Sequence, residues 1–295
     1  MGKIPLLLDG AMGTELQYRN VEIPLPLWTA DANISHPDVV TSIHSEYINA
    51  GADIITTNTF RSTSWTYRKT GLNDLQSQIR AKNSLYSAVE CAHNASNVLV
   101  KIAGSITSID DCYLPEKFPG RSIAHDIYGQ TLEWLIDAGV DVILFETMGN
   151  AEEIDIALSL SSKYKNAIWL SVIMKDSKRI LDGTHIKDIF SLANRYSVQI
   201  FIANCNIISK TILLLKQFHL FWGKKWGVYP NLGETDYDNN YFKTISEKKF
   251  SNGMKNILKY SPNLIGGCCG SRPKHIKILK NLLIKGNKDV FENKA

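Results

Sequence analysis

The segment Ala138-Gly139-Val140-Asp141-Val142-Ile143-Leu144-Phe145 carries the pattern that decides the fold of this chain. Its second half is continuously apolar and lacks the alternation of a strand with one face in water. It therefore predicts a parallel strand that helices cover on both faces. Gly139 stands just before the strand, where a glycine ends a helix because it tolerates the left-handed backbone conformation. The segment Ala50-Gly51-Ala52-Asp53 repeats this signal before another apolar run.

Short apolar runs alternate with longer amphipathic stretches along the whole chain. The expected strands are Leu6–Asp9, Ile54–Asn58, Val98–Ser105, Val142–Met148, Ala167–Ile173, Gln199–Cys205, Trp226–Asn231 and Leu264–Gly270. The expected helices are Asp38–Ala50, Asp74–Asn97, Ser122–Ala138, Ala151–Tyr164, Ile186–Tyr196, Ile208–His219, Met254–Tyr260 and Pro273–Lys285. Strand and helix repeated eight times predict an α/β fold, a single (β/α)₈ TIM barrel, as one domain over residues 1–295.

Three long irregular stretches interrupt this pattern: 19–37, 107–121 and 233–251. Each follows the carboxyl end of an expected strand. In a barrel of this kind the loops at that end build the active site. The sequence therefore predicts that any functional site lies among these three loops.

Composition narrows the class of protein further. The 33 basic and 29 acidic residues give a formal net charge of +4 and are scattered along the chain, which gives no support to nucleic-acid binding. The amino-terminal apolar run meets Asp9 too soon for a signal peptide, and no stretch is long enough for a membrane helix. Five cysteines, two of them adjacent, suit reduced thiols better than disulfides. We expect a cytoplasmic protein.

Three of the cysteines stand at the ends of expected strands. Cys205 ends the sixth strand, and Cys268 with Cys269 ends the eighth, so all three thiols would meet at one rim of the barrel. Adjacent side chains on a regular strand point to opposite faces, so this pair can share a metal only where the strand breaks into a turn. Three glycines near the pair give the backbone that freedom: Gly266, Gly267 and Gly270.

Three thiolates favour zinc over magnesium or calcium, and three protein ligands leave one tetrahedral position open for a substrate. Two other readings exist. Buried cysteines often serve as small apolar residues, or the backbone of Gly266-Gly267 could form the phosphate site that many barrels carry near strands seven and eight. Cys91, in a helical pattern, and Cys112, in a loop, are expected to be incidental.

Several spaced motifs in one order carry a resemblance to a known family. They are Leu7-Leu8-Asp9-Gly10-Ala11-Met12-Gly13-Thr14-Glu15-Leu16, Ala50-Gly51-Ala52-Asp53, Thr57-Asn58-Thr59-Phe60, Phe145-Glu146-Thr147, Asn204-Cys205, Tyr229-Pro230-Asn231 and Gly266-Gly267-Cys268-Cys269-Gly270. Over nearly its whole length the chain resembles the homocysteine S-methyltransferases. That family shares its barrel with betaine-dependent enzymes and with the homocysteine domain of cobalamin-dependent methionine synthase.

The resemblance implies that Cys205, Cys268 and Cys269 bind one zinc ion per chain and that the homocysteine sulfur takes the fourth position. A thiol on a divalent cation loses its proton and becomes a nucleophile for the methyl donor. The product would be methionine. No general base is needed in this scheme.

The resemblance also implies a set of residues around the amino-acid end of homocysteine: Asp9, Gly10, Thr59 and Glu146, with Glu146 holding the ammonium group. Taken alone, Asp9 before a glycine is a turn signal, and Glu146 is an acid near the start of a helix.

Other polar residues at the rim have less specific roles. Asn204 and Asn231 end strands and could hydrogen-bond a metal ligand, a backbone group or the substrate. His44 is expected to pack against the barrel wall.

The methyl donor is expected to be a small molecule, because the barrel uses nearly all of the chain and leaves no carrier domain. S-methylmethionine and S-adenosylmethionine are candidates, since a sulfonium methyl is already activated. Four loop aromatics could face such a cation: Trp28, Tyr67, Tyr113 and Tyr237. The donor stays open, because residues 104–108 and 181–183 depart from the Gly-Pro-Tyr-Gly and Ser-Asp-Gly runs typical of the S-methylmethionine branch.

Two alternatives remain. The same barrel could take the methyl group from a corrinoid protein or pass it to another thiol or a selenol. It could also be a non-catalytic barrel that binds zinc and thiols. Oligomeric state is not encoded in any pattern that we identify.

Overall fold

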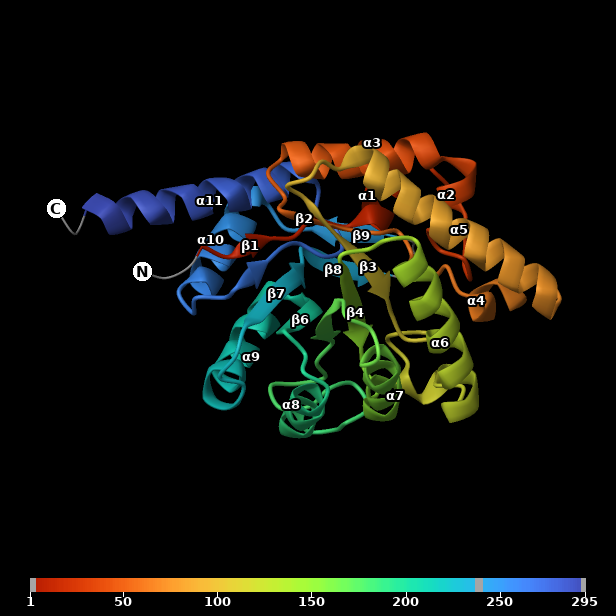
Figure 1. Cartoon of the computed structure of the whole chain (residues 1–295). Helices are drawn as coiled ribbons and strands as arrows, with labels where there is room; N and C mark the ends of the chain where they lie inside the picture. Colours follow the sequence, from red (N-terminus) through yellow and green to blue (C-terminus); the bar gives the residue numbers. More distant parts are fainter. Residues whose placement is uncertain (1–3, 237–240, 293–295) are drawn as a thin grey trace.

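The computed structural model describes residues 4–236 and 241–292, and Figure 1 shows a ring of helices around a parallel sheet. The strands of this sheet are β1 (Leu6–Leu7), β2 (Ile54–Thr56), β3 (Lys101–Ile106), β4 (Val142–Met148), β5 (Ala167–Val172), β6 (Ile200–Ile207), β7 (Trp226–Asn231) and β10 (Leu264–Ile265). They pair side by side from β2 to β7, followed by β10 and β1. A parallel bridge between Leu8 and Ile54 joins β1 back to β2. The sheet closes, and the predicted (β/α)₈ barrel is confirmed.

The barrel is covered by α3 (Pro37–Asn49), α5 (Asp74–Ala95), α6 (Arg121–Asp137), α7 (Ala151–Ser161), α8 (Ile186–Arg195), α9 (Ile208–Phe221), α10 (Glu247–Leu258) and α11 (Pro273–Glu292). Neighbours in the ring pack on one another, and α11 returns to contact α3. Gly51 (φ +107°) and Gly139 (φ +86°) adopt the left-handed conformation after α3 and α6. The two glycine signals read from the sequence are therefore confirmed as helix ends.

The apolar residues form two layers. Val142 and Leu144 of β4 pack inside the barrel with residues such as Ile202 of β6. Ile143 and Phe145 face outward and pack under the helices. Each face of the sheet packs against its own apolar layer, which explains why the strands are continuously apolar.

Two strand boundaries differ most from the sequence-based expectation. The third strand was expected to begin at Val98 but begins at Lys101, and Val98 is fully exposed before it. The eighth strand was expected to reach Gly270 but ends at Ile265, because the chain then turns at the glycines. Apolar composition alone does not distinguish an exposed apolar residue from the first residue of a buried strand.

The segments between the expected strands and helices contain more regular structure than predicted. Three short helices, none of them expected, stand among the loops at the carboxyl ends of β1 and β2: α1 (Met12–Tyr18), α2 (Ala32–Ser35) and α4 (Ser64–Arg68). The stretch after β7 forms a hairpin of β8 (Gly233–Asp236) and β9 (Tyr241–Thr244). Helix α10 begins at Glu247 rather than at Met254, with the Ser246 hydroxyl accepting the Lys249 amide as an N-cap.

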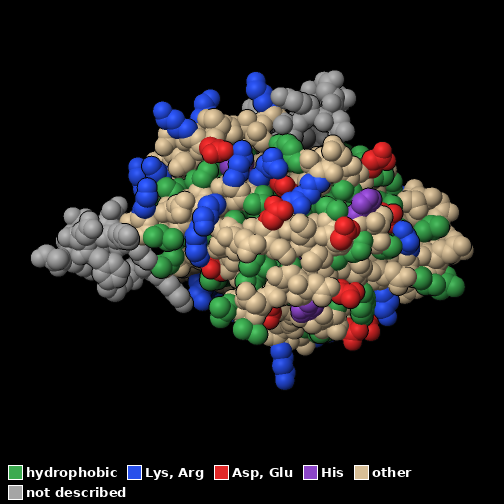
Figure 2. Space-filling view, turned by 90° about the horizontal axis from the view of Figure 1, so that it is seen from above, with side chains coloured by type: hydrophobic (Ala, Val, Ile, Leu, Met, Phe, Trp, Pro, Cys, Tyr) green, Lys and Arg blue, Asp and Glu red, His purple; other side chains and the backbone are tan. Residues whose placement is uncertain are grey.

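The surface has mixed charge. Figure 2, seen from above the view of Figure 1, shows basic and acidic side chains interspersed across this face, with Lys and Arg denser on its left half. Among the described residues, no helix is long and apolar enough to cross a membrane.

Candidate metal centre and substrate pocket

Three cysteine sulfurs meet at the carboxyl end of the barrel. The sulfurs of Cys205, Cys268 and Cys269 all lie within 4.8 Å of one another. The Cys205 and Cys268 sulfurs are 2.6 Å apart, and those of Cys268 and Cys269 are 4.0 Å apart. All three side chains are partly buried free thiols. The convergence expected from the sequence is therefore present in the structure.

A bulge in β6 turns Cys205 toward the other two thiols. Ile200, Ile202 and Asn204 alternate along β6, and the first two pack inside the barrel. A regular strand would point Cys205 to the opposite face. Instead the register with β7 shifts after Asn204, and Cys205 has a left-handed φ of +53°. Such a bulge re-aims a side chain at a barrel rim, at a cost of order 1 kcal/mol or more in backbone strain.

The glycines beside Cys268 and Cys269 serve two different purposes. Gly270 has φ +79°, which is the freedom predicted from the sequence. Gly266 and Gly267 do not have positive φ. They leave room for their neighbours, because a Cβ on Gly266 would lie 2.9 Å from Leu8 Cβ and a Cβ on Gly267 would lie 2.6 Å from Ser271 Cβ. Their amides donate to Val228 O and Asp9 O, so the backbone phosphate site considered above is not available there.

The residues of the cluster fit a zinc ion. Tetrahedral zinc with Zn–S bonds of about 2.3 Å keeps its sulfurs about 3.8 Å apart, close to the 4.0 Å separation of Cys268 and Cys269. Cys205 and Cys268 are closer than this and would separate by about 1 Å around the ion. Hydrogen bonds from the other two thiols hold the pKa of Cys269 well below its ordinary value. The donor set therefore already favours one thiolate before any metal binds.

Two asparagines hold Cys205 in place. The Asn204 amide nitrogen donates to Thr147 Oγ1 at 2.8 Å and to the Cys205 sulfur at 3.5 Å, while its oxygen accepts the Thr147 amide and the Ser171 hydroxyl. The Asn231 amide nitrogen donates to the Cys205 carbonyl at 3.0 Å. Asn204 thus contacts the sulfur of a candidate metal ligand, and Asn231 contacts the backbone of the same residue.

Asp9 lies at the end of β1 with its carboxylate turned into the barrel. Its oxygens accept the Thr56 amide at 2.8 Å and the Thr56 hydroxyl at 3.0 Å. Burial raises the pKa of Asp9 to about 8, and the nearby Glu146 carboxylate contributes in the same direction. A turn signal alone does not explain why Asp9 is only 4% exposed and lies beside a second acid.

Glu146 is the second acid, and it is partly buried at a bulge in β4 where the next residue, Thr147, has φ +58°. Its oxygens accept hydrogen bonds from the Ser105 hydroxyl and, at 3.1 Å, from the Tyr229 hydroxyl. Burial raises the pKa of Glu146, and the Cys269 thiolate adds to the shift. Cys269, Glu146 and Asp9 therefore form one electrostatically coupled group inside the barrel mouth.

Thr59 and Gly10 shape this pocket. The Thr59 hydroxyl donates to Ser105 O at 2.7 Å, directly behind the Glu146 contact. A Cβ on Gly10 would lie 2.6 Å from Ser271 Oγ and 2.7 Å from Tyr47 Cε1. Thr59 thus supports the pocket wall, and Gly10 allows the chain to pass close to two side chains.

Sequence reasoning assigned no role to Ser105, Thr56 or Tyr229, although all three contact the two acids. Each stands at or near the carboxyl end of a strand. Their position near a strand end was the only signal in the sequence. It did not show that they contact the acids, because those contacts depend on which strands lie side by side.

The loop aromatics occupy different environments. The cysteine thiols, Cys205 foremost, raise the pKa of Tyr113, so its hydroxyl lies within their electrostatic reach. Tyr67 is buried with its hydroxyl 3.5 Å from Asp31, and Trp28 packs against Gly13. Tyr237 lies outside the described residues. Of the three described aromatics, Tyr113 has the clearest link to the cluster.

Two expectations about other residues can be compared with the structure. His44 is completely buried on α3, as expected for packing against the barrel wall, and burial lowers its pKa to about 4. Cys112 is buried as well, but its thiol is coupled electrostatically to Cys269.

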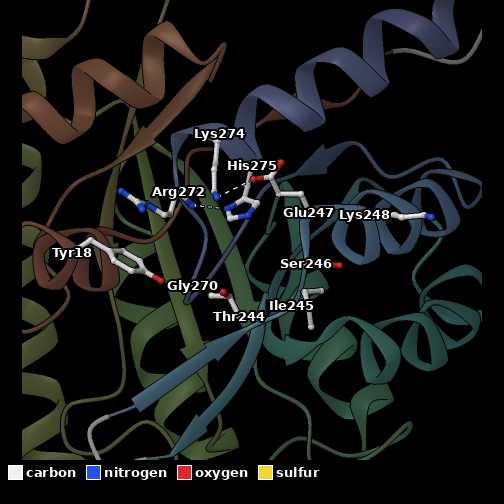
Figure 3. A pocket seen from close by; sticks show the side chains of 10 residues that line it. All are labelled: Tyr18, Thr244, Ile245, Ser246, Glu247, Lys248, Gly270, Arg272, Lys274 and His275. Carbon is white, nitrogen blue, oxygen red and sulfur yellow. Dashed lines mark hydrogen bonds and ion pairs between the residues drawn. The ribbon is translucent and has the colours of Figure 1, made fainter.

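A separate cavity of about 570 Å³ lies between α1, β9 and the starts of α10 and α11 (Figure 3). Arg272 and Lys274 line it, but both are already paired. Arg272 binds Glu15 at 3.1 Å and stacks on Tyr18, and Lys274 binds Glu247 at 2.9 Å. The charges that Figure 3 displays around this cavity are thus largely neutralised from within the chain.

Comparisons with known proteins agree with the geometry. A family model described as homocysteine S-methyltransferase matches residues 6–283. The homocysteine S-methyltransferase of Escherichia coli is 29% identical over 93% of this chain and 94% of its own length. A selenocysteine methyltransferase of Astragalus bisulcatus is 26% identical, covering 98% and 95%. The metallated form of the homocysteine methyltransferase MmuM from Escherichia coli superposes with a TM-score of 0.82 at 26% identity, covering 95% and 96%.

Proposed function

The chain belongs to the homocysteine S-methyltransferase family, and we propose that it is a zinc-dependent enzyme that methylates homocysteine to methionine with a small methyl donor. The observation that carries the proposal is the meeting of three cysteine sulfurs within 4.8 Å beside two acids of raised pKa, Asp9 and Glu146. A zinc site of this kind works only with reduced thiols, which favours the cytoplasm.

Cys205, Cys268 and Cys269 would hold one zinc ion, which supplies the Lewis acidity that turns a bound thiol into a thiolate. The protein contributes the orientation of the ligands. Asn204 and Thr147 donate to the Cys205 sulfur, and such contacts fix a ligand in one rotamer. With three protein ligands, one tetrahedral position stays available for the sulfur of the acceptor.

Asp9 and Glu146 would bind the ammonium group of homocysteine. Asp9 is buried and Glu146 is partly buried, and the described contacts of their carboxylates are with neutral donors: Thr56 for Asp9, and Ser105 and Tyr229 for Glu146. An arriving ammonium would ionise them and gain charge-assisted hydrogen bonds in a site of low polarity. Because this pocket adjoins Cys269, the same molecule can present its thiol to the cluster.

The methyl donor approaches from the loop side of the cluster. A sulfonium methyl needs only alignment with the attacking sulfur, which binding in a fixed pocket provides. Tyr113, within electrostatic reach of the cysteines, offers an aromatic ring to a cationic donor. S-methylmethionine and S-adenosylmethionine both meet this requirement.

The test measures methionine formation by zinc-loaded protein from homocysteine with S-methylmethionine, S-adenosylmethionine or betaine. We expect turnover with a sulfonium donor, and zinc analysis should give one ion per chain. Cys268→Ala should lose both zinc and turnover, whereas Cys91→Ala, at a buried cysteine on α5, should keep both. Retained zinc and turnover in Cys268→Ala would refute the site.

Two other results would redirect the proposal. Turnover with selenocysteine but not with homocysteine would change the acceptor, an outcome raised by the Astragalus relative. Zinc binding without methyl transfer from any small donor would favour the two remaining alternatives, an enzyme that depends on a corrinoid protein or a non-catalytic barrel.

A further inference from the structure

Segment 229–232 comprises the end of β7 and the residue that follows it, and β7 lies between the two strands that lead to the cysteines. All four residues of the segment are buried. Three of them are hydrogen-bonded to the backbone of a cysteine of the cluster. The pairs are Pro230 O with Cys268 N at 2.9 Å, Asn231 Nδ2 with Cys205 O at 3.0 Å, and Leu232 N with Cys269 O at 2.9 Å. One short segment therefore holds the main chain of all three candidate metal ligands.

The first residue of the segment contacts the acid of the proposed ammonium site. Tyr229 is 2% exposed and belongs to the apolar layer inside the barrel, and its hydroxyl donates to Glu146 Oε2 at 3.1 Å. Because β6 and β5 stand between β7 and β4, this side chain reaches the acid across the barrel interior. The other donor to this carboxylate, Ser105, comes from β3, directly beside β4. Segment 229–232 thus joins the acid to the cysteines.

The Tyr229 hydroxyl is close to both halves of the site. Burial raises the pKa of Tyr229 well above its ordinary value, and the Glu146 carboxylate adds to the shift. The thiols of Cys268 and Cys205 act in the same direction. The phenol therefore stays protonated at neutral pH and serves as a hydrogen-bond donor. A donor to a carboxylate in a site of low polarity is held strongly, so it fixes one oxygen of Glu146.

We infer that Tyr229 is a positioning residue that selects the chain length of the acceptor, because it fixes Glu146 relative to the three thiols. The inference rests on the proposed function, in which the acceptor places its ammonium on Glu146 and its sulfur at the cluster. Cysteine is one methylene shorter than homocysteine. When one buried segment holds both ends of the site, the shorter chain cannot reach both, and a misplacement of about 1 Å can cost about 100-fold.

The experiment measures the binding of homocysteine and of cysteine to zinc-loaded protein by calorimetry, with no methyl donor present. The wild type should bind homocysteine at least about tenfold more tightly than cysteine. Tyr229→Phe keeps the ring and removes the hydroxyl. It should weaken homocysteine binding about tenfold and change cysteine binding less than about twofold, so that the preference for homocysteine falls. Its zinc content should stay that of the wild type.

Two further variants serve as controls. Tyr128→Phe removes a similarly buried hydroxyl, which donates to Thr107 O at 3.2 Å from α6, and should leave the preference unchanged. Ser105→Ala removes the other donor to Glu146 and keeps its contact with the segment, so both ligands should weaken in proportion. Proportional weakening in Tyr229→Phe would show a merely structural role and overturn the inference. An equal loss of preference in Ser105→Ala would also overturn it, because any donor to Glu146 would then suffice.

Methyl transfer measured on the same proteins separates the inference from the proposed function. If the wild type shows the preference that depends on Tyr229 but transfers no methyl group from any donor, only the proposed function is rejected. If it forms methionine and the preference is the same in Tyr229→Phe, only the inference is rejected. A wild type that forms methionine and binds the two amino acids equally would likewise reject the inference alone.

Discussion

Single residues at the barrel mouth occupy conformations that a regular strand does not allow. Thr147 and Cys205 both have left-handed backbones, at bulges in β4 and β6. Non-glycine residues adopt φ near +55° at a cost and only where the surroundings require it. At these bulges Glu146 of β4 and the thiol of Cys205 of β6 face the same small volume. The backbone strain is thus concentrated where the chemistry is expected.

Replacing Glu146 tests the ammonium site at this scale. Glu146→Gln keeps the shape of the side chain and removes its charge. Losing a charge-assisted hydrogen bond of about 1.5 to 3 kcal/mol should lower kcat/KM for homocysteine roughly 10- to 100-fold, mainly through KM. Steady-state kinetics at saturating donor measures the effect, and Glu90→Gln, exposed on α5, is the control. A normal KM in Glu146→Gln would remove this residue from the substrate site.

At the scale of secondary-structure elements, helices and loops hold the rim in place through buried polar contacts. Glu153 in the first turn of α7 is 2% exposed and accepts the Ile109 amide at 2.7 Å. Ile109 belongs to the loop between β3 and α6, which also carries Tyr113. Helix α7 thereby anchors a loop that reaches the cysteine cluster.

The Glu153 anchor gives a prediction about loop order. Glu153→Ala leaves the Ile109 amide without its acceptor, so the free energy of unfolding should fall by about 2 kcal/mol. Amide hydrogen exchange at Ile109 should become faster. Glu152→Ala removes an exposed neighbour that pairs with Arg121 on the surface, and should cost less than about 1 kcal/mol. Equal effects of the two variants would argue against an anchoring role.

His44 makes α3 sensitive to acid. Both ring nitrogens lack a partner among the described residues, and burial lowers the pKa to about 4 from an ordinary 6.5. The unfolded chain takes up this proton near pH 6.5, whereas the folded chain stays neutral until about pH 4. The free energy of unfolding should therefore fall by about 3 kcal/mol on this account between pH 7 and pH 4.

His44→Leu isolates this contribution by filling the site with an apolar side chain of similar size. Denaturant unfolding at pH 7 and at pH 4 should show that the variant loses about 3 kcal/mol less than the wild type across this range. Parallel pH profiles for the two proteins would show that His44 is not protonated on unfolding.

For the whole molecule, the cysteine cluster connects distant parts of the chain. Cys205 lies near the carboxyl end of β6, whereas Cys268 and Cys269 follow β10, with β7 between these two strands in the sheet. A metal bound only by the folded arrangement stabilises the fold according to its concentration relative to Kd.

Zinc should therefore raise the melting temperature of the metal-free protein. At zinc about 100-fold above Kd the stabilisation is about 2.7 kcal/mol, or roughly 4 °C for a chain of this size. Calorimetric melting with and without zinc measures the shift. Magnesium should have no effect, because thiolates are poor ligands for it. Cys268→Ala should melt at the same temperature with and without zinc, and a full zinc shift in that variant would place the metal elsewhere.

The sequence by itself determined the architecture and the chemical character of the site. Continuous apolar strands such as Val142–Phe145 and the helix-ending glycines 51 and 139 are local signals, because strand burial and backbone conformation depend on residues close in sequence. The position of Cys205, Cys268 and Cys269 near the carboxyl ends of strands was equally readable, since parallel strands end at a common rim.

Only the tertiary structure decided which side chains meet. A period of two would have turned Cys205 away from the cluster, and the bulge that redirects it arises from pairing with β7, which has no local signal. Ser105 and Tyr229 reach Glu146 from strands far away in sequence. These contacts exist because the sheet closes into a barrel, and closure depends on the pairing of all eight strands at once.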